Sequence, residues 1–127
     1  MKLDELVYGE ESYIITGVLF RVFNSLGPGH REKNYHNAVG KLLQDLEIPF
    51  VSERYSPLKV DGLLVGKYYL DFLVYDKIAI ELKSKNHFYK RDIDQLFSYL
   101  VNNSLQLGIL ANFASQGVNT KRIINIH

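Results

Sequence analysis

Apolar residues recur three or four positions apart in three stretches of the chain, which predicts three amphipathic helices. The first covers residues 10–26 and ends at Gly27, a residue suited to a helix C-terminus. The second covers about 31–47, after the break at "GPGH", and the third covers about 89–103. The predicted apolar stripes are Tyr13, Ile14, Val18, Val22 and Leu26; then Tyr35, Val39, Leu42 and Leu46; then Ile93, Leu96, Phe97 and Leu100.

Residues 49–84 instead follow a strand pattern, rich in β-branched and aromatic residues. Turns near Ser56-Pro57, Asp61-Gly62 and Asp76-Lys77 divide this stretch into three or four strands, and short strands follow at 105–112 and 121–126. Strands joined by short turns pair antiparallel, whereas the helix between Ser84 and Leu105 is a crossover that allows a parallel partner. The order predicts an α/β fold with a mixed sheet flanked by helices.

The composition is typical of a folded, soluble protein. The 127 residues form one expected domain (1–127), with 46% hydrophobic and 23% charged residues. Cysteine is absent, which excludes disulfides and thiolate metal sites. The first residues are acidic where a signal peptide would be apolar, and no run reaches the roughly 18–20 apolar residues of a membrane span. We therefore expect a cytoplasmic protein with no membrane partner.

Positive charge is concentrated in one segment. The net charge of +1 gives no general attraction to nucleic acid. However, a basic segment of five residues within nine could follow phosphates locally: Lys83, Lys85, His87, Lys90 and Arg91. A solvated loop leading into a helix explains the same segment equally well.

The strand at 78–84 has one charged face. Glu81 and Lys83 alternate with Ile80 and Leu82, so the two charged side chains project side by side. A solvent-facing strand would explain this pair without any function. Other parts of the chain must decide between the two interpretations.

Four more polar residues are candidates for the same site. Asp71 lies in the strand before, on the face opposite to the one we expect Tyr68, Leu70, Phe72 and Val74 to form. Glu32 lies in the first turn of the second helix, where an acid interacts favourably with the positive end of the helix dipole. Its spacing from Tyr35, however, predicts that its side chain faces the sheet. Gln95 and Tyr99 are four residues apart on the third helix and share a face. The histidines at 30, 36 and 87 have no convincing partner in the sequence, so we assign them no role.

These residues resemble a known pattern when they are taken in order. Asp71 followed by Glu81-Leu82-Lys83 resembles the D…(D/E)-x-K signature of the PD-(D/E)xK nuclease superfamily. The segment from Gly29 through Glu32 to Tyr35 resembles the GxxExxY motif of one bacterial and archaeal branch, and Gln95 to Tyr99 resembles a Q-x-x-x-Y motif. The resemblance covers about residues 17–126. It departs from the pattern in lacking a proline before Asp71 and in having Val39 where a leucine is usual.

The resemblance implies a restriction-endonuclease-like α-β-β-β-α-β core and metal-dependent hydrolysis of phosphodiesters, by an endonuclease or an exonuclease. Asp71 and Glu81 would hold Mg²⁺ or Mn²⁺ through oxygen ligands, with Glu32 as a third carboxylate. The metal would polarise a phosphoryl oxygen and activate the attacking water. Lys83 would orient that water or stabilise the developing charge. The implied catalytic residues are thus Glu32, Asp71, Glu81 and Lys83, and the implied substrate-positioning residues are Gln95, Tyr99 and Tyr35.

Nucleic acid is the expected partner, DNA ahead of RNA, and a homodimer would present two sites to two strands. Two alternatives stay open. One is a module that keeps the fold and binds nucleic acid without cleaving it. The other is a protein-interaction or regulatory subunit, because nine tyrosines are many for this length.

A shared site makes a demand on strand register. A two-residue turn at Asp76-Lys77 would pair Tyr75 with Ile78 and would put Glu81 on the wrong face from Asp71. We therefore predict an odd connection, such as Tyr75-Asp76-Lys77, or a β-bulge nearby.

Overall fold

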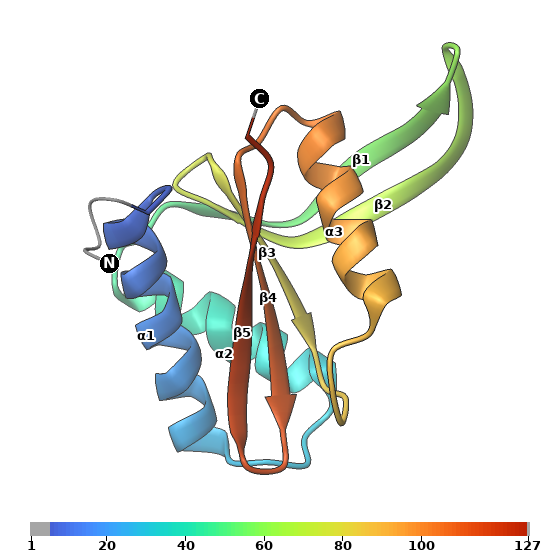
Figure 1. Ribbon diagram of the computed structural model, residues 1–127. Coiled ribbons are helices and arrows are strands. Elements are labelled where there is room, and N and C mark those ends of the chain that lie inside the picture. The colour runs from blue at the N-terminus through green and yellow to red at the C-terminus, as the bar shows by residue number, and fades with distance from the viewer. Residues whose placement is uncertain (1–5, 127) are drawn as a thin grey trace.

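The computed structural model describes residues 6–126 and contains three helices and five strands in this range (Figure 1). In chain order the elements are α1 (Gly9–Leu26), α2 (Glu32–Asp45), β1 (Phe50–Val60), β2 (Leu63–Val74), β3 (Ile78–Lys83), α3 (Lys90–Asn102), β4 (Leu107–Ala114) and β5 (Gly117–Ile124). The helix boundaries lie within two residues of the predicted ones. Gly27 ends α1 with a φ of 75°, a conformation that glycine adopts without strain.

The strands form one sheet in the order β1-β2-β3-β4-β5. β3 and β4 are parallel and are joined by α3, whereas the other neighbours are antiparallel. α1 and α2 cover one face of the sheet and α3 covers the other (Figure 1). The predicted α/β fold with a mixed sheet between helices is confirmed. Among residues 6–126, no helix is long and apolar enough to cross a membrane.

The β2–β3 connection has the odd length that a shared site requires. Val74 pairs with Ile78, so three residues connect the strands. Tyr75 and Asp76 both have positive φ, and the Lys77 N–H donates to the Val74 carbonyl at 3.1 Å, as in a tight turn followed by one extra residue. The register prediction is confirmed. Extended by two pairs beyond Leu73–Ala79, the same register sets Asp71 opposite Glu81.

β2 does not keep one apolar face, and the prediction that it would do so is wrong. Phe72 and Val74 pack on the side of α1 and α2, whereas Leu70 and Leu73 pack on the side of α3. The alternation changes at Asp71, where the pairing of β1 with β2 omits Asp71 and the residue opposite it, Glu53. Glu53 has a φ of 51°, which interrupts the regular strand geometry at this point.

The helices bury only part of each predicted stripe, with neighbouring residues in place of the others. α1 buries Ile15, Val18, Leu19 and Val22, and it leaves Tyr13 and Ile14 exposed. α2 buries Leu43 together with Tyr35 and Val39, whereas Leu46 is exposed. α3 buries Asp92 and exposes Phe97. Successive residues on a helix point about 100° apart, so a residue one position away from a buried one can face solvent.

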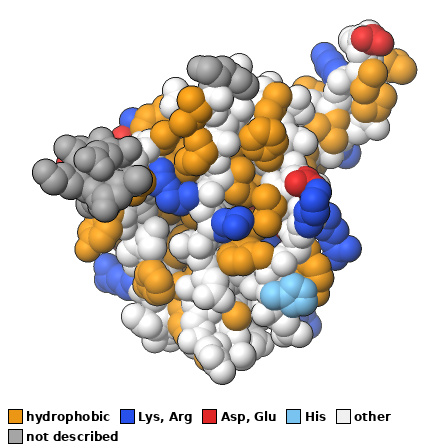
Figure 2. Space-filling model, viewed as in Figure 1, with side chains coloured by type: hydrophobic (Ala, Val, Ile, Leu, Met, Phe, Trp, Pro, Cys, Tyr) orange, Lys and Arg blue, Asp and Glu red, His pale blue; other side chains and the backbone are white. Residues whose placement is uncertain are grey.

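The predicted turn at Ser56-Pro57 is absent, because β1 continues through both residues to Val60. Pro57 is tolerated there because β1 lies at the edge of the sheet, where a missing N–H need not break a ladder. The β1–β2 hairpin turns at Asp61-Gly62 as predicted, and its end projects away from the body of the molecule (Figure 1). Figure 2 shows apolar side chains at this end, where Val60, Leu63, Leu64 and Val65 are exposed.

Candidate active site

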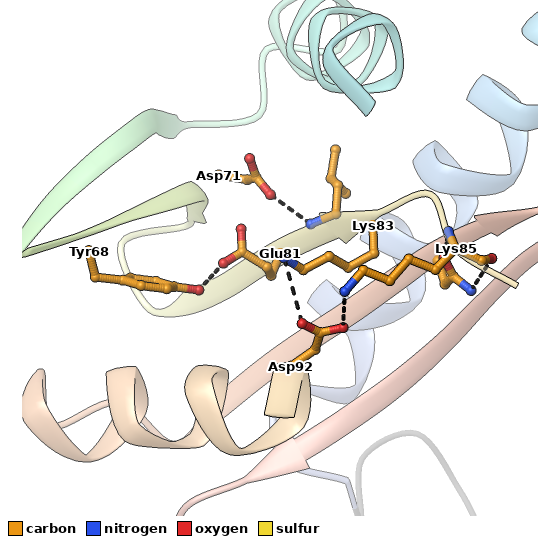
Figure 3. Close-up of polar contacts among 8 residues, drawn as sticks. Tyr68, Asp71, Glu81, Lys83, Lys85 and Asp92 are labelled. Carbon is orange, nitrogen blue, oxygen red and sulfur yellow. Dashed lines mark hydrogen bonds and ion pairs between the residues drawn. The ribbon is translucent and has the colours of Figure 1, made fainter. Parts of the chain in front are cut away.

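Asp71, Glu81 and Lys83 lie close together on β2 and β3, between the first turns of α2 and α3. Figure 3 shows Asp71 and Glu81 beside each other, with Lys83 continuing the same strand toward Asp92 at the start of α3. Because α2 and α3 lie on opposite faces, the site draws side chains from both layers as well as from the sheet.

Asp71 is held by two hydrogen bonds. Its Oδ2 accepts from the backbone N–H of Leu82 at 2.7 Å, and its Oδ1 lies 3.0 Å from Nδ1 of His36 on α2. Burial raises the pKa of the Asp71 carboxyl, whereas the Leu82 N–H and His36 act against that rise. Asp71 is therefore a desolvated but well-partnered acid whose orientation is set by its neighbours.

Glu81 is the most perturbed acid of the site. It is only 6% exposed, and the hydroxyl of Tyr68 donates a hydrogen bond to it. Burial raises the pKa of Glu81 to about 7, although Lys83 and the backbone N–H of Asp71 favour the ionised form. A carboxylate kept in this state beside a second acid is typical of functional sites.

Lys83 and Lys85 converge on one buried carboxylate. Asp92 is 6% exposed, and its Oδ1 lies 3.8 Å from Nζ of Lys83 while its Oδ2 lies 2.7 Å from Nζ of Lys85. The side chain of Asn112 also bonds the backbone of Lys85, accepting from its N–H at 2.8 Å and donating to its carbonyl at 2.9 Å. These contacts hold both ammonium groups at the end of β3.

Glu32 is exposed, so the prediction that it continues the buried stripe of α2 is wrong. As the first residue of α2 it lines an open cleft of about 360 Å³ with Ser84, Lys85 and the two residues before it. Desolvation by the cleft walls raises the pKa of Glu32, with Lys83 acting against this and Asp71 adding to it. Glu32 thus faces the site from its rim.

The three predicted substrate-positioning residues lie in different surroundings. Gln95 is exposed and lines an open cleft of about 440 Å³ that also includes Asp92. Tyr99 is 3% exposed and packs against Tyr68 with ring centroids 5.6 Å apart. Its hydroxyl has no hydrogen-bond partner among residues 6–126, and burial raises its pKa.

Tyr35 is fully buried and has a structural part. Its hydroxyl donates to the Gly27 carbonyl at 2.7 Å, and its ring stacks on Phe113 at 4.2 Å. These contacts hold the loop that precedes α2. A direct contact between Tyr35 and a substrate would require that loop to open.

The donor set fits a hard divalent cation only in part. Among the described residues, no three His, Asp or Glu side chains stand close enough together to hold a metal ion. Asp71 and Glu81 are nevertheless neighbours on facing strands, since Asp71 accepts from the Leu82 N–H and Glu81 from the Asp71 N–H, and burial of Glu81 without a full counter-charge favours a cation there. Carboxylate oxygens are the ligands that Mg²⁺ and Mn²⁺ prefer.

Sequence reasoning missed four residues that organise the site: His36, Tyr68, Asp92 and Asn112. His36 follows Glu32 by one helical turn, a spacing that could have placed it near the same strand. Asp92 lies in the first turn of α3, where an acid is ordinarily assigned to the helix dipole. The sequence carries no comparable signal for Asn112, which lies in an apolar strand.

Two solved structures have a fold similar to that of this chain. The crystal structure of SSO0001 aligns with a TM-score of 0.54 and 19% identity, over 72% of this chain and 48% of that one. The present chain therefore spans about half the length of SSO0001. An alkaline exonuclease (LHK-Exo) from Laribacter hongkongensis aligns with a TM-score of 0.54 and 12% identity, over 94% of this chain and 71% of that one. At these identities the two structures share the fold.

No curated protein sequence matches the chain. The model of one family, described as the PD-(D/E)XK nuclease superfamily, matches residues 9–123. That range includes all three helices and all five strands apart from the last residue of β5. It also includes all the carboxylates and lysines described above. The chain belongs to the PD-(D/E)XK nuclease superfamily.

Proposed function

We propose that this protein is a metal-dependent nuclease that hydrolyses phosphodiester bonds in nucleic acid. The observation that carries the proposal is the β2–β3 register, which pairs Phe72 with Ile80 and so brings Asp71 next to Glu81, with Lys83 two residues further along β3. Two adjacent acids and one cation are the groups that metal-assisted phosphoryl transfer requires. Within the superfamily we further propose the GxxExxY branch, on the basis of Gly29, Glu32 and Tyr35.

Asp71 and Glu81 would hold Mg²⁺ or Mn²⁺, and Glu32 would contribute a third carboxylate from the rim of the cleft. A bound divalent ion would supply Lewis-acid activation of the phosphodiester and of the attacking water. Asp71 has both oxygens oriented by donors, and Glu81 is oriented by Tyr68. Because a raised pKa leaves Glu81 partly protonated near neutral pH, binding of the ion would displace that proton.

Lys83 would stabilise the negative charge that develops on the phosphate. Its side chain is about one-fifth exposed, so the ammonium is shielded yet open to a ligand. Asp92 keeps Lys83 and Lys85 on the same side of β3, where both cations would meet a phosphate entering the cleft. Gln95 would contact the substrate from the rim, and Tyr99 would support Tyr68 from below.

A panel of end-labelled substrates tests this function. Single-stranded, duplex and branched DNA and matched RNA are incubated with the protein in Mg²⁺, in Mn²⁺ and in EDTA. We expect cleavage only with a divalent ion, on DNA ahead of RNA, and the product sizes will separate internal cuts from removal of ends. Absence of cleavage on every substrate with either ion would contradict the proposal.

Binding without cleavage is the second candidate. It is favoured by the pairing of Lys83 with Asp92, which offsets the charge of the proposed catalytic lysine, while Arg91 of the basic segment stays exposed to contact phosphates. A protein of this kind would shift labelled DNA in a gel equally well in EDTA and in Mn²⁺, and it would leave the strand intact in both.

We also propose a homodimer. The apolar end of the β1–β2 hairpin exposes Leu63 and Val65, side chains that favour contact with another protein surface. Light scattering of the purified protein should give twice the monomer mass if two copies associate, and the monomer mass would contradict this proposal.

A further inference from the structure

We propose that His36 is a positioning residue for Asp71, which fixes the direction of the Asp71 carboxylate so that it can act as a metal ligand. The inference rests on the proposed function, because it concerns how the proposed site is kept in shape. His36 belongs to α2, outside the strands that carry the acids, and its role follows from contacts found only in the folded protein.

The geometry at Asp71 fixes the carboxylate from two sides. Nδ1 of His36 lies 3.0 Å from Oδ1, and the Leu82 N–H lies 2.7 Å from Oδ2. One bond alone would let the carboxylate rotate about that contact, whereas two bonds to different oxygens define its plane. Each oxygen keeps a second lone pair for a cation.

The backbone at Asp71 does not provide this orientation by itself. The β1–β2 ladder omits Asp71 and Glu53, and β2 changes face at this residue. A side chain at an irregular point of a strand is not committed to one face by the pleat. Side-chain contacts must therefore select its direction, and His36 is the partner that comes from the α2 layer.

His36 is itself held firmly. Its side chain is 15% exposed, and its ring stacks on Phe72 with centroids 4.4 Å apart and planes 21° apart. The other ring nitrogen, Nε2, lies 4.0 Å from Glu53, a side chain that is 76% exposed and adds little. An ionised Asp71 can only accept hydrogen bonds, so Nδ1 of His36 carries a hydrogen and donates a hydrogen bond to Oδ1.

Three substitutions separate positioning from packing. His36→Asn places an amide N–H close to the position of Nδ1, so it can still donate to Asp71. His36→Gln places its amide near the position of Nε2, which faces away from Asp71. His36→Phe keeps a ring over Phe72 but has no donor. If His36 positions Asp71, only the asparagine variant should keep an Mn²⁺ affinity close to that of wild type. Asparagine is nevertheless the poorest of the three at filling the volume of the imidazole ring.

The test is isothermal titration of Mn²⁺ into each purified protein, with urea unfolding in EDTA measured alongside. Loss of a side chain that orients a ligand typically weakens metal binding about 10- to 100-fold. We expect such a loss in His36→Phe and His36→Gln, and a smaller loss, under about 5-fold, in His36→Asn. The unfolding data should show the phenylalanine variant at least as stable as the asparagine variant.

Wild-type Mn²⁺ affinity in His36→Phe would overturn the inference and would leave the proposed function standing. Equal losses in all three variants, in proportion to their losses of stability, would also overturn it and would assign His36 to packing. Wild-type protein that binds no Mn²⁺ would instead contradict the metal site itself, and with it both proposals.

Discussion

The backbone N–H of Leu82 donates a 2.7 Å hydrogen bond to the carboxylate of Asp71. This bond joins β2 to β3 through a side chain at the point where the regular ladder stops, one residue after Glu81. It therefore couples the position of one acid to the strand that carries the other. The backbone N–H of Asp71 in turn favours ionisation of Glu81, so each acid is held by the other's strand.

The raised pKa of Glu81 predicts how stability depends on pH. The pKa rises from 4.5 to about 7 on folding, so the folded protein binds the proton more tightly. The stabilisation is complete below pH 4.5 and is lost as the pH rises to 7, at most about 3 kcal/mol. Urea unfolding in EDTA should show wild type losing stability between pH 5 and pH 8.

Glu81→Gln is the matched variant for this prediction, since glutamine keeps an acceptor for Tyr68 without a titrating group. Its loss of stability over the same pH range should be clearly smaller than that of wild type. Parallel curves for the two proteins would mean that Glu81 is ionised at low cost in the folded state.

Lys83→Ala should slow cleavage about 10²- to 10³-fold, the usual cost of removing a group that stabilises transition-state charge. Mn²⁺ affinity should change little, because an ammonium is not a metal ligand. Single-turnover kinetics and Mn²⁺ titration measure the two effects. Lys41→Ala is the control, since Lys41 lies on α2 away from the site and forms an exposed pair with Asp45. Near-normal turnover in Lys83→Ala would remove Lys83 from the mechanism.

Asp92→Asn should weaken both stability and cleavage, because two lysines lose their shared counter-charge. Removing a partner from a largely buried ionic hydrogen bond costs about 1–3 kcal/mol. Asp94→Asn provides the comparison: Asp94 is on the same helix and bonds Lys90 at 2.6 Å, but in an exposed pair that should contribute little. Urea unfolding and cleavage assays on both variants check this. Equal effects in the two would contradict the role of Asp92.

Tyr35→Phe should reduce stability by about 1 kcal/mol, because the hydroxyl no longer donates to Gly27 or accepts from the His30 N–H. The affinity for nucleic acid should follow only in proportion to that loss. Tyr13→Phe, at an exposed position of α1, should change neither. A Tyr35→Phe protein of normal stability that binds DNA poorly would restore the predicted contact between Tyr35 and the substrate.

The sequence pattern was sufficient for the order and type of the elements, because the helices and strands here have distinct periods. It also predicted the Tyr75–Lys77 connection, because Asp71 and Glu81 could not otherwise meet. The change of face at Asp71 was not predictable, since it depends on an interruption at Glu53 in another strand.

The helical contributions were harder for a related reason. His36 and Asp92 reach the site only because α2 and α3 pack on opposite faces of the sheet. The spacing of residues within each helix does not indicate which side chain they will contact there. For Glu32 the spacing was misleading. It places Glu32 on the same helix face as the buried Tyr35, but α2 begins at the edge of the cleft, so that face is exposed to solvent at Glu32.

The metal site can be tested before any substrate is known, by measuring the free energy of unfolding in urea with and without Mn²⁺. Ion bound only by the folded state at ten times its dissociation constant should add about 1.4 kcal/mol. We expect wild type to gain this stability and Asp71→Asn to lose most of the gain, while their stabilities in EDTA stay similar. An equal gain in both proteins, or no gain in wild type at millimolar Mn²⁺, would contradict a metal site built on Asp71 and Glu81.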